Sequence, residues 1–302
     1  MVFGNLFGRP KTTTGSMPSK AVKGPRVNIE KRFSILGETS SQGSMSRVFK
    51  AHDTQAGRTV CLKLQDLSKN AQAAARAVKE GRPSEGEMAA KVVHPHVVRT
   101  YEYGMTTTRE YYIVMEYIDG QSLTFIRESR PFRLAERLEF LAQAAEGLAA
   151  IHAAGFIHHD FGPKNALVDR NDQVKIIDFG LAVPNTAAFH RPGNRTGTLI
   201  YMAPELVRRE STNERLDVFS FGATAFEFLT NRLPYDAPAA NSMAQAQARI
   251  NLDPLDLAKI KPDFPAELCE LIGKTLARRR EDRRIKMAAL PGMLREIAAK
   301  HA

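Results

Sequence analysis

Residues 157–165 read IHHDFGPKN, and residues 174–180 read VKIIDFG. The first run follows a long stretch with the spacing of an amphipathic helix, and the second opens on residues typical of a β-strand. A loop would therefore present Asp160 and Asn165, and a strand would deliver Asp178. Three oxygen-bearing side chains on such supports can hold Mg²⁺ and orient a hydroxyl nucleophile. Phosphoryl transfer uses this arrangement, because its catalysis consists mostly of positioning and of neutralising phosphate charge.

The two runs resemble the catalytic loop and the D-F-G motif of the Hanks-type protein Ser/Thr kinases. By that resemblance, Asp160 is the catalytic base that accepts the proton of the substrate hydroxyl. Asn165 and Asp178 are implied as ligands of Mg²⁺, with Mn²⁺ as an alternative ion. A lone D-F-G tripeptide is a weak signal, but it is strong downstream of a matching catalytic loop. The resemblance implies a two-lobed α+β fold, with an antiparallel β-sheet and one helix in the N-terminal lobe and mainly α-helices in the C-terminal lobe.

Residues 60–63 read VCLK, which resembles the strand motif that carries the phosphate-binding lysine of the family. By this resemblance Lys63 contacts the α- and β-phosphates of ATP. A solvated lysine in a strand is the plain alternative, but Lys63 has apolar neighbours on both sides. A helix rich in Ala and Glu is expected over 82–93. On that helix Glu85 is the expected ion-pair partner of Lys63, and Glu87 is the second choice.

Residues 196–205 read TGTLIYMAPE and resemble the end of a kinase activation segment. Residues 216–222 read LDVFSFG and resemble the helix that anchors the large lobe of the family. The resemblance implies that Asp217 holds the backbone of the catalytic loop. It also implies that Arg283 pairs with Glu205.

Residues 114–120 read VMEYIDG and look like the gatekeeper and hinge of the family. Met115 would back the adenine pocket, and the backbone at Glu116 and Ile118 would hydrogen-bond the edge of adenine. An apolar strand that runs into a turn also describes this stretch, so the functional interpretation depends on the motifs on either side. The other residues that the resemblance assigns to ATP binding are Gly43, Val48, Cys61 and Leu167. Cys61 is interpreted as part of the pocket roof rather than as a redox switch.

The glycine-rich loop that covers the phosphates in the family is incomplete in this chain. Counted back from Val48, its three glycine positions hold Ser41, Gly43 and Ser46. Glycine at these positions lets backbone amides approach the phosphates. Serine is small and can donate a hydrogen bond of its own. We therefore expect a weaker affinity for ATP than a complete loop would give, but not its loss.

The catalytic loop also departs from the family. His159 replaces an arginine that usually docks a phosphorylated activation segment, which predicts less dependence on such phosphorylation. A histidine could serve in part, more so when protonated. Gly162 stands where Ser/Thr kinases usually place a lysine, and our hypothesis is that Lys164 supplies that charge. The alternative is that Lys164 is a solvated residue and the enzyme is slow. Pro163 and residues 197–198 resemble the Ser/Thr branch rather than the tyrosine branch.

The order of elements predicts a strand-rich N-terminal part followed by a helix-rich C-terminal part. Helices are expected over 134–153 and 212–229 and over much of 255–290. The predicted parts are a basic, disordered tail over 1–30 and a kinase domain over 31–298, divided into an N-lobe (about 31–117), a hinge (about 116–120) and a C-lobe (about 121–298).

The composition is ordinary for a soluble protein, with 43% hydrophobic and 25% charged residues. The most apolar stretch, 218–230, is too short to cross a membrane and predicts a buried helix. Two distant cysteines, Cys61 and Cys269, fit no metal-ligand spacing and favour the cytoplasm. The net charge of +10 includes a basic cluster at 278–284, but aromatic residues are not interleaved with it. A solvated surface is therefore favoured over a nucleic-acid partner.

Two other functions compete with a protein kinase. A pseudokinase, which binds nucleotide or acts as a scaffold with little turnover, is favoured by the incomplete glycine loop and by Gly162. It is opposed by the joint presence of residues with separate chemical roles, namely Lys63, Asp160, Asn165 and Asp178. A small-molecule phosphotransferase of similar fold would share the Asp and Asn of the loop. Residues 203–205 resemble a platform for protein substrates, which favours protein substrates and ATP as the partners.

Overall fold

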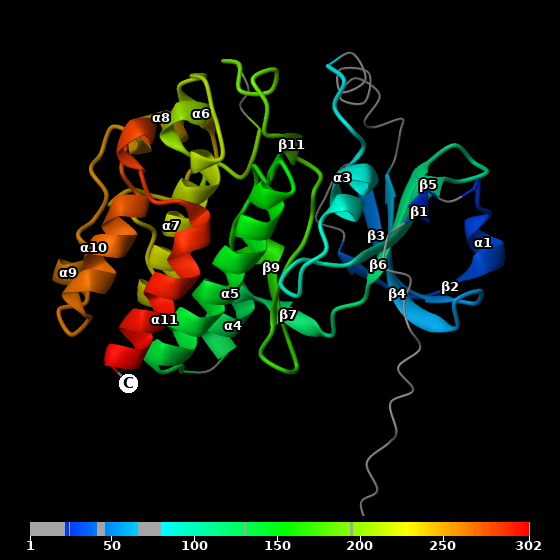
Figure 1. Ribbon diagram of the computed structural model, residues 1–302, viewed down its shortest axis with the longest axis horizontal. Helices are drawn as coiled ribbons and strands as arrows, with labels where there is room; N and C mark the ends of the chain where they lie inside the picture. The colour runs from blue at the N-terminus through cyan, green and yellow to red at the C-terminus, as the bar shows by residue number, and fades with distance from the viewer. Residues whose placement is uncertain are drawn as a thin grey trace, which may run out of the picture.

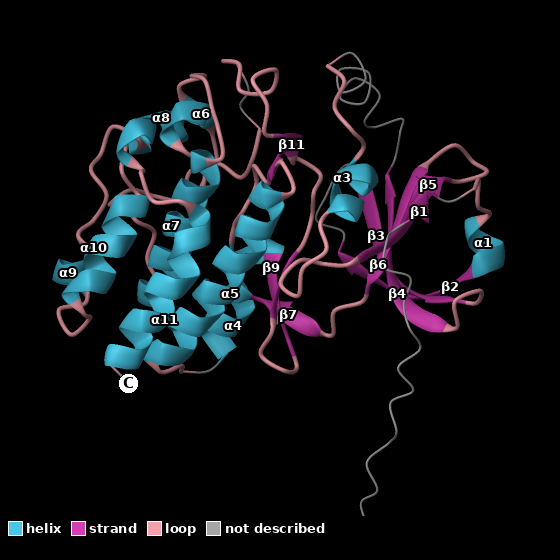
Figure 2. Cartoon of the chain, in the orientation of Figure 1, coloured by secondary structure: helices cyan, strands magenta, loops and turns pink. Residues whose placement is uncertain are grey.

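The structure is a computed structural model that describes residues 22–23, 25–40, 46–65, 80–129, 131–193 and 196–301. Two lobes are visible in Figure 1, with the sheet on the right and most helices on the left. Figure 2 shows how strands dominate one lobe and helices the other. The expected two-lobed α+β fold is confirmed. Ser41 and Gly43 of the incomplete glycine loop lie outside the described residues.

The N-terminal lobe contains a six-stranded sheet with the spatial order β1-β5-β6-β4-β3-β2. Its strands are β1 (Val22–Lys23), β2 (Phe33–Ser40), β3 (Ser46–Asp53), β4 (Arg58–Gln65), β5 (Thr100–Met105) and β6 (Tyr111–Glu116). Neighbouring strands are antiparallel except β1, which runs parallel to β5. The central strands are rich in β-branched and aromatic residues, which suit a pleated and half-buried surface.

The fold reaches further toward the N-terminus than the expected boundary of the tail over 1–30. Strand β1 pairs with β5, and the Val27 amide donates a hydrogen bond to the Met105 carbonyl at 3.2 Å. Helix α1 (Ile29–Arg32) follows directly. The edge of a sheet offers unpaired backbone groups that can order a segment with no apolar periodicity of its own. The expected tail is therefore wrong for its described residues.

Helix α3 (Glu85–Lys91) is shorter than the helix expected over 82–93. Pro83 precedes Ser84, whose side chain caps the helix by accepting a hydrogen bond from the Glu87 amide. The cap places the helix start three residues later than the composition suggested. It also makes Glu85 the first helical residue, and α3 packs against β5 of the sheet.

The C-terminal lobe is mainly helical. Its longer elements are α4 (Leu123–Ser129), α5 (Leu134–Ala153), α7 (Arg215–Thr230), α8 (Met243–Arg249), α10 (Ala266–Thr275) and α11 (Leu290–Lys300). Short helices are α6 (Pro204–Val207) and α9 (Leu257–Ile260), with 3₁₀ turns η1 (Pro163–Asn165), η2 (Arg280–Asp282) and η3 (Met287–Ala289). Small strands are β7 (Gly120–Ser122), β8 (Phe156–Ile157), β9 (Ala166–Asp169), β10 (Val174–Ile176) and β11 (Val183–Pro184).

The helix expected over 134–153 is confirmed as α5, which packs against α7 and α11. Helix α7 is buried on almost all sides, and Phe219, Phe221 and Phe226 are fully buried in it. An apolar helix of this kind belongs to the core of a large lobe. Among the described residues, no helix has the length and hydropathy needed to span a membrane.

Candidate active site

A buried carboxylate anchors the loop that carries Asp160. The backbone amides of His158 and His159 donate to the two carboxylate oxygens of Asp217 at 2.8 and 2.9 Å. His152 Nε2 lies 2.8 Å from one of these oxygens. Burial alone would raise the pKa of Asp217, but the hydrogen bond from His152 helps to hold that pKa below its ordinary value. Helix α7 therefore fixes the catalytic loop through an ionised side chain.

The half-buried Asp160 side chain touches residues 197–198, near the end of the segment that resembles a kinase activation segment. Its Oδ1 accepts a hydrogen bond from the Thr198 amide at 2.6 Å, and its carbonyl accepts one from Asn165 Nδ2 at 2.8 Å. Gly197 precedes this contact with φ of 125°, and a Cβ there would lie 3.1 Å from the His159 carbonyl oxygen. Glycine is therefore required for the close approach of the two loops.

Lys63 lies between two carboxylates that come from opposite lobes. Its Nζ is 2.6 Å from Glu85 Oε1 and 2.9 Å from Asp178 Oδ1. Burial alone would lower the pKa of Lys63, but Glu85 and Asp178 raise it above its usual range. Burial alone would raise the pKa of Asp178, but Lys63 outweighs it and lowers that pKa to about 2. The pair of Lys63 and Asp178 is therefore ionised throughout the physiological range.

Asn165 and Asp178 have oxygen atoms that fit a divalent cation. The Asn165 amide nitrogen is used by the Asp160 carbonyl, which leaves its side-chain oxygen for a ligand. Asp178 uses Oδ1 for Lys63 and for the Gly180 amide, and Oδ2 has no hydrogen bond within the described ranges. The Ile177 amide donates to the Asn165 carbonyl at 2.9 Å, so Asn165 lies beside the residue that directly precedes Asp178. One carboxylate and one amide oxygen are hard ligands that suit Mg²⁺ or Mn²⁺.

The residues expected to surround adenine share one face of the N-lobe sheet. Val48 is opposite Lys63, and Cys61 is opposite Met115, so their side chains point the same way. Cys61 and Ile118 pack against the buried cluster that contains Met115. Burial raises the pKa of the Cys61 thiol to about 11, which keeps it protonated. That state agrees with a role in the pocket roof.

The expected hinge, which begins at Glu116, contacts the C-lobe strands that carry Leu167 and Lys175. The Glu116 carboxylate pairs with Lys175 of β10 at 2.9 Å and accepts from the Arg99 amide at 2.7 Å. Leu167 lies on β9, opposite Lys175 of strand β10 and opposite Ser122 of strand β7. The side chain of Glu116 thus connects the segment expected to contact adenine with the C-lobe.

A family model described as "Protein kinase domain" matches residues 34–290. This chain belongs to the protein kinase family. Its relatives include "Probable serine/threonine-protein kinase pknA2" of Bifidobacterium longum (30% identity over 91% of this chain), "Serine/threonine-protein kinase PknB" of Mycolicibacterium smegmatis (32% over 82%) and "Serine/threonine-protein kinase pkn2" of Myxococcus xanthus (33% over 76%). The matches span 36%, 40% and 28% of those relatives, respectively. The resemblance to Hanks-type Ser/Thr kinases is confirmed.

An aromatic ring lies against Gly162, the position at which the family resemblance implies a lysine. A Cβ built on Gly162 would lie 2.9 Å from Cδ2 of Tyr201. The Tyr201 hydroxyl donates to Glu227 Oε2 at 2.6 Å, which holds the ring in place. Lys164 is exposed and forms no ion pair with any described residue.

His159 is not placed to serve, even in part, as the docking cation that the family arginine provides. Its side chain is buried, and neither ring nitrogen has a hydrogen-bond partner among the described residues. Burial lowers the pKa of the imidazole, although Asp217 acts in the opposite direction. A neutral, enclosed ring cannot bind a phosphate at the surface, so the partial role allowed for His159 is excluded, whereas reduced dependence on phosphorylation stays a prediction.

Three residues of the kinase site escaped the sequence analysis. Tyr201 lies in the motif over 196–205, but its contact with Gly162 depends on the fold. Gln65 donates to the second oxygen of Glu85 and so supports the ion pair. Arg82 reaches two carbonyls beyond Asp178, at a sequence distance that no local pattern reveals.

Proposed function

We propose that this kinase transfers the γ-phosphate of ATP to serine or threonine hydroxyls of protein substrates. The observation that carries the proposal is the convergence of Asp160, Asn165 and Asp178 at one place, with Lys63 bound to Asp178. Each has a separate task in phosphoryl transfer. The catalytic unit is proposed to be residues 31–298, together with the described residues before 31 that pair with β5, and to act in the cytoplasm.

ATP is proposed to bind between the lobes. The backbone at Glu116 and Ile118 would meet the edge of adenine, with the gatekeeper Met115 behind it. Lys63 would bind the α- and β-phosphates, and its pairing with Glu85 at 2.6 Å holds its ammonium group in the site. The side chains proposed to enclose the nucleotide are Val48, Cys61 and Leu167, under the loop that contains Gly43.

The divalent ion, Mg²⁺ or Mn²⁺, would be held by Asn165 and Asp178. When bound, it supplies positive charge to the phosphate oxygens. Asp160 would orient the substrate hydroxyl and accept its proton. The hydrogen bond from the Thr198 amide to Asp160 Oδ1, at 2.6 Å, orients the carboxylate for this task and links it to the substrate-facing segment.

We propose that Lys164 supplies the charge that the family lysine would supply at Gly162. The exposed position of Lys164 and the ring of Tyr201 above Gly162 support this assignment. Single-turnover transfer by Lys164→Ala tests it, with Lys164→Arg as the charge-preserving control. Unchanged transfer in Lys164→Ala would end the idea.

Serine and threonine are proposed as acceptors because Pro163 and the element 197–198 resemble that branch. The curated relatives are named as serine/threonine-protein kinases, which agrees with the choice. Phosphoamino-acid analysis of the product distinguishes these acceptors from tyrosine. Phosphotyrosine as the main product would contradict the assignment.

Transfer of labelled γ-phosphate from ATP to dephosphorylated casein tests the proposed activity. Asp160→Asn and Asp178→Ala should reduce transfer to background, and the exposed Asp263→Asn is the matched control that should leave it unchanged. Wild-type transfer no higher than that of Asp160→Asn would overturn the proposal. A panel of sugars and choline as acceptors excludes or reveals a small-molecule phosphotransferase.

A pseudokinase is the second candidate, and the ring of Tyr201 over Gly162 is the observation that favours it. A pseudokinase would bind ATP, as shown by thermal stabilisation with nucleotide, without transferring phosphate. Binding together with transfer above the Asp160→Asn background excludes this candidate.

A further inference from the structure

Arg82 connects the N-lobe to the residues that follow Asp178. It lies three positions before Glu85, at the approach to helix α3. Its Nε donates to the Ala182 carbonyl at 2.9 Å, and its Nη2 donates to the Gly180 carbonyl at 2.6 Å. In Figure 1, α3 is the helix of the N-lobe that faces the C-lobe. A single side chain thus holds two backbone groups of the opposite lobe.

The Arg82 contacts complete a closed set of interactions. Helix α3 carries Glu85, which binds Lys63 at 2.6 Å, and Lys63 binds Asp178 at 2.9 Å. Gly180 follows Asp178 by two residues. The Gly180 carbonyl accepts a hydrogen bond from Arg82, which lies just before α3. Helix α3 is therefore tied to this segment twice, through Lys63 and through Arg82. A shift of either the helix or the segment breaks both ties.

Arginine suits this place better than lysine. Its planar guanidinium presents several N–H donors in a rigid fork, so one side chain reaches two carbonyls. Hydrogen bonds from a charged donor are stronger than neutral ones. Burial lowers the pKa of Arg82, while Glu85 and Glu80 act in the opposite direction. The group remains a cation, because arginine titrates far above physiological pH.

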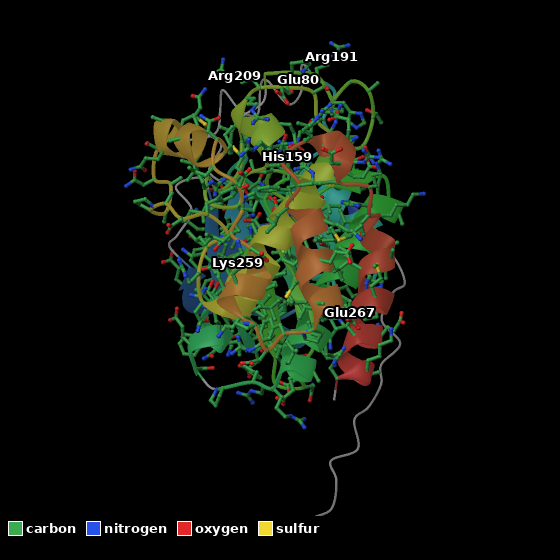
Figure 3. The ribbon with its side chains drawn as sticks, turned by 90° about the vertical axis from the view of Figure 1, so that its left-hand side faces the viewer. Glu80, His159, Arg191, Arg209, Lys259 and Glu267 are labelled. Carbon is green, nitrogen blue, oxygen red and sulfur yellow. The ribbon has the colours of Figure 1, made fainter. Side chains whose placement is uncertain are left out.

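The position that would dock a phosphate in the family holds a buried, neutral ring in this kinase. Figure 3 draws His159 within the body of the molecule, whereas Arg191 and Arg209 project from its upper edge. Arg82 instead uses its donors on backbone carbonyls that are present whether or not the segment is phosphorylated.

We infer that Arg82 is a positioning residue that orders the start of the activation segment, so that the site assembles without a phosphate on that segment. The inference rests on the proposed kinase activity. Loss of Arg82 would free the Gly180 and Ala182 carbonyls and loosen Asp178, the proposed metal ligand. Misplacement of such a group by about 1 Å can cost about a hundredfold in rate.

The experiment compares wild type, Arg82→Ala, Arg82→Lys and the exposed Arg191→Ala as the matched control. All are treated with phosphatase and checked by intact mass. We expect kcat of Arg82→Ala to fall by about tenfold to a hundredfold, with partial rescue in Arg82→Lys. Arg191→Ala should stay within about twofold of wild type, and phosphatase treatment should leave wild-type kcat unchanged.

Hydrogen exchange separates positioning from a general loss of stability. In Arg82→Ala, amides over 179–183 should exchange faster, including that of Ala182, which donates to the Phe179 carbonyl at 3.0 Å. Amides of the buried helix α7 should keep their protection. Faster exchange across α7 as well would show a merely structural role and overturn the inference.

Two kinetic results would also overturn it. One is a kcat for Arg82→Ala that equals that of the wild type. The other is a loss of activity when the wild-type protein is treated with phosphatase. If wild type itself shows no transfer above Asp160→Asn, the proposed function fails separately. The exchange measurement then decides the role of Arg82 by itself, since it needs no turnover.

Discussion

Because the His159 ring is buried, we expect acid to destabilise this protein, and we expect replacement of His159 to remove that part of the pH dependence. The side chain is 3% exposed, and its ring nitrogens have no hydrogen-bond partner among the described residues. Burial is the largest influence and lowers the pKa of the ring. Asp217 and Asp160 raise it, and Arg82 and His158 lower it further. The net result is a histidine that folds in its neutral form.

The sign and size of the effect follow from proton linkage. In the unfolded chain the ring titrates near its ordinary pKa of 6.5, whereas in the folded chain it takes up its proton only at lower pH. Stability from this group is therefore complete above pH 6.5 and is lost as the pH falls toward the lower, folded pKa. If the folded ring stays neutral, the loss between pH 8 and pH 5.5 reaches at most about 1.4 kcal/mol.

Urea unfolding of wild type and His159→Asn at pH 8, 7, 6 and 5.5 measures this loss. Asparagine does not titrate and tolerates the φ of 72° at this position. The variant should lose less stability between pH 8 and 5.5 than wild type, by up to about 1.4 kcal/mol. The half-buried His52→Asn is the control and should keep the wild-type dependence, because His52 forms no hydrogen bond or ion pair through its side chain among the described residues. Equal dependence in wild type and His159→Asn would refute the argument from burial.

Three further substitutions test the packing around the site. Gly162→Ala should lower the free energy of unfolding by about 1 to 3 kcal/mol, because its Cβ would lie 2.9 Å from the Tyr201 ring; urea unfolding measures this, and a neutral result means that the ring moves freely. Arg283→Met should cost about 3 to 5 kcal/mol, because it leaves the buried Glu205 carboxylate without its ion-pair partner. The same unfolding assay should show a smaller loss when Glu205→Gln is added, and an equal or larger loss would contradict the explanation. Asp217→Asn should lower kcat at least about tenfold with little change in KM for ATP, because the loop amides lose a charged acceptor while the adenine contacts remain; steady-state kinetics decide, and an unchanged kcat would show that the loop holds its own shape.

The sequence predicted those elements whose signal is local and periodic. Helix α5 begins and ends where its apolar spacing does, because one face of it packs on the core of the C-lobe. Helix α3 is shorter than predicted, since Ser84 caps it after Pro83. The described residues before 31 have the composition of a tail, because the partner that orders them, strand β5, lies far along the chain. Local composition contains no trace of such a partner.

The same division applies to the site. Lys63 and Glu85 stand on elements whose order along the chain matches a known family, so their ion pair could be anticipated. Arg82 could not, because it contacts residues 98 and 100 positions away through their backbone, and backbone acceptors leave no mark in a sequence. The burial of His159 was missed for a related reason, since a histidine in a loop gives no sign of the φ of 72° that turns it inward.

Gly162 and His159 were both interpreted as losses of positive charge from the catalytic loop, and the structure gives them different consequences. At Gly162 a Cβ would lie 2.9 Å from the Tyr201 ring, so restoring a lysine there would require the ring to move. At His159 the lost charge is offset nearby by Arg82, which acts on backbone rather than on phosphate. The two departures are therefore not equivalent evidence for a pseudokinase. Only at Gly162 would a restored side chain meet the Tyr201 ring, and we propose that the exposed Lys164 supplies the charge missing there.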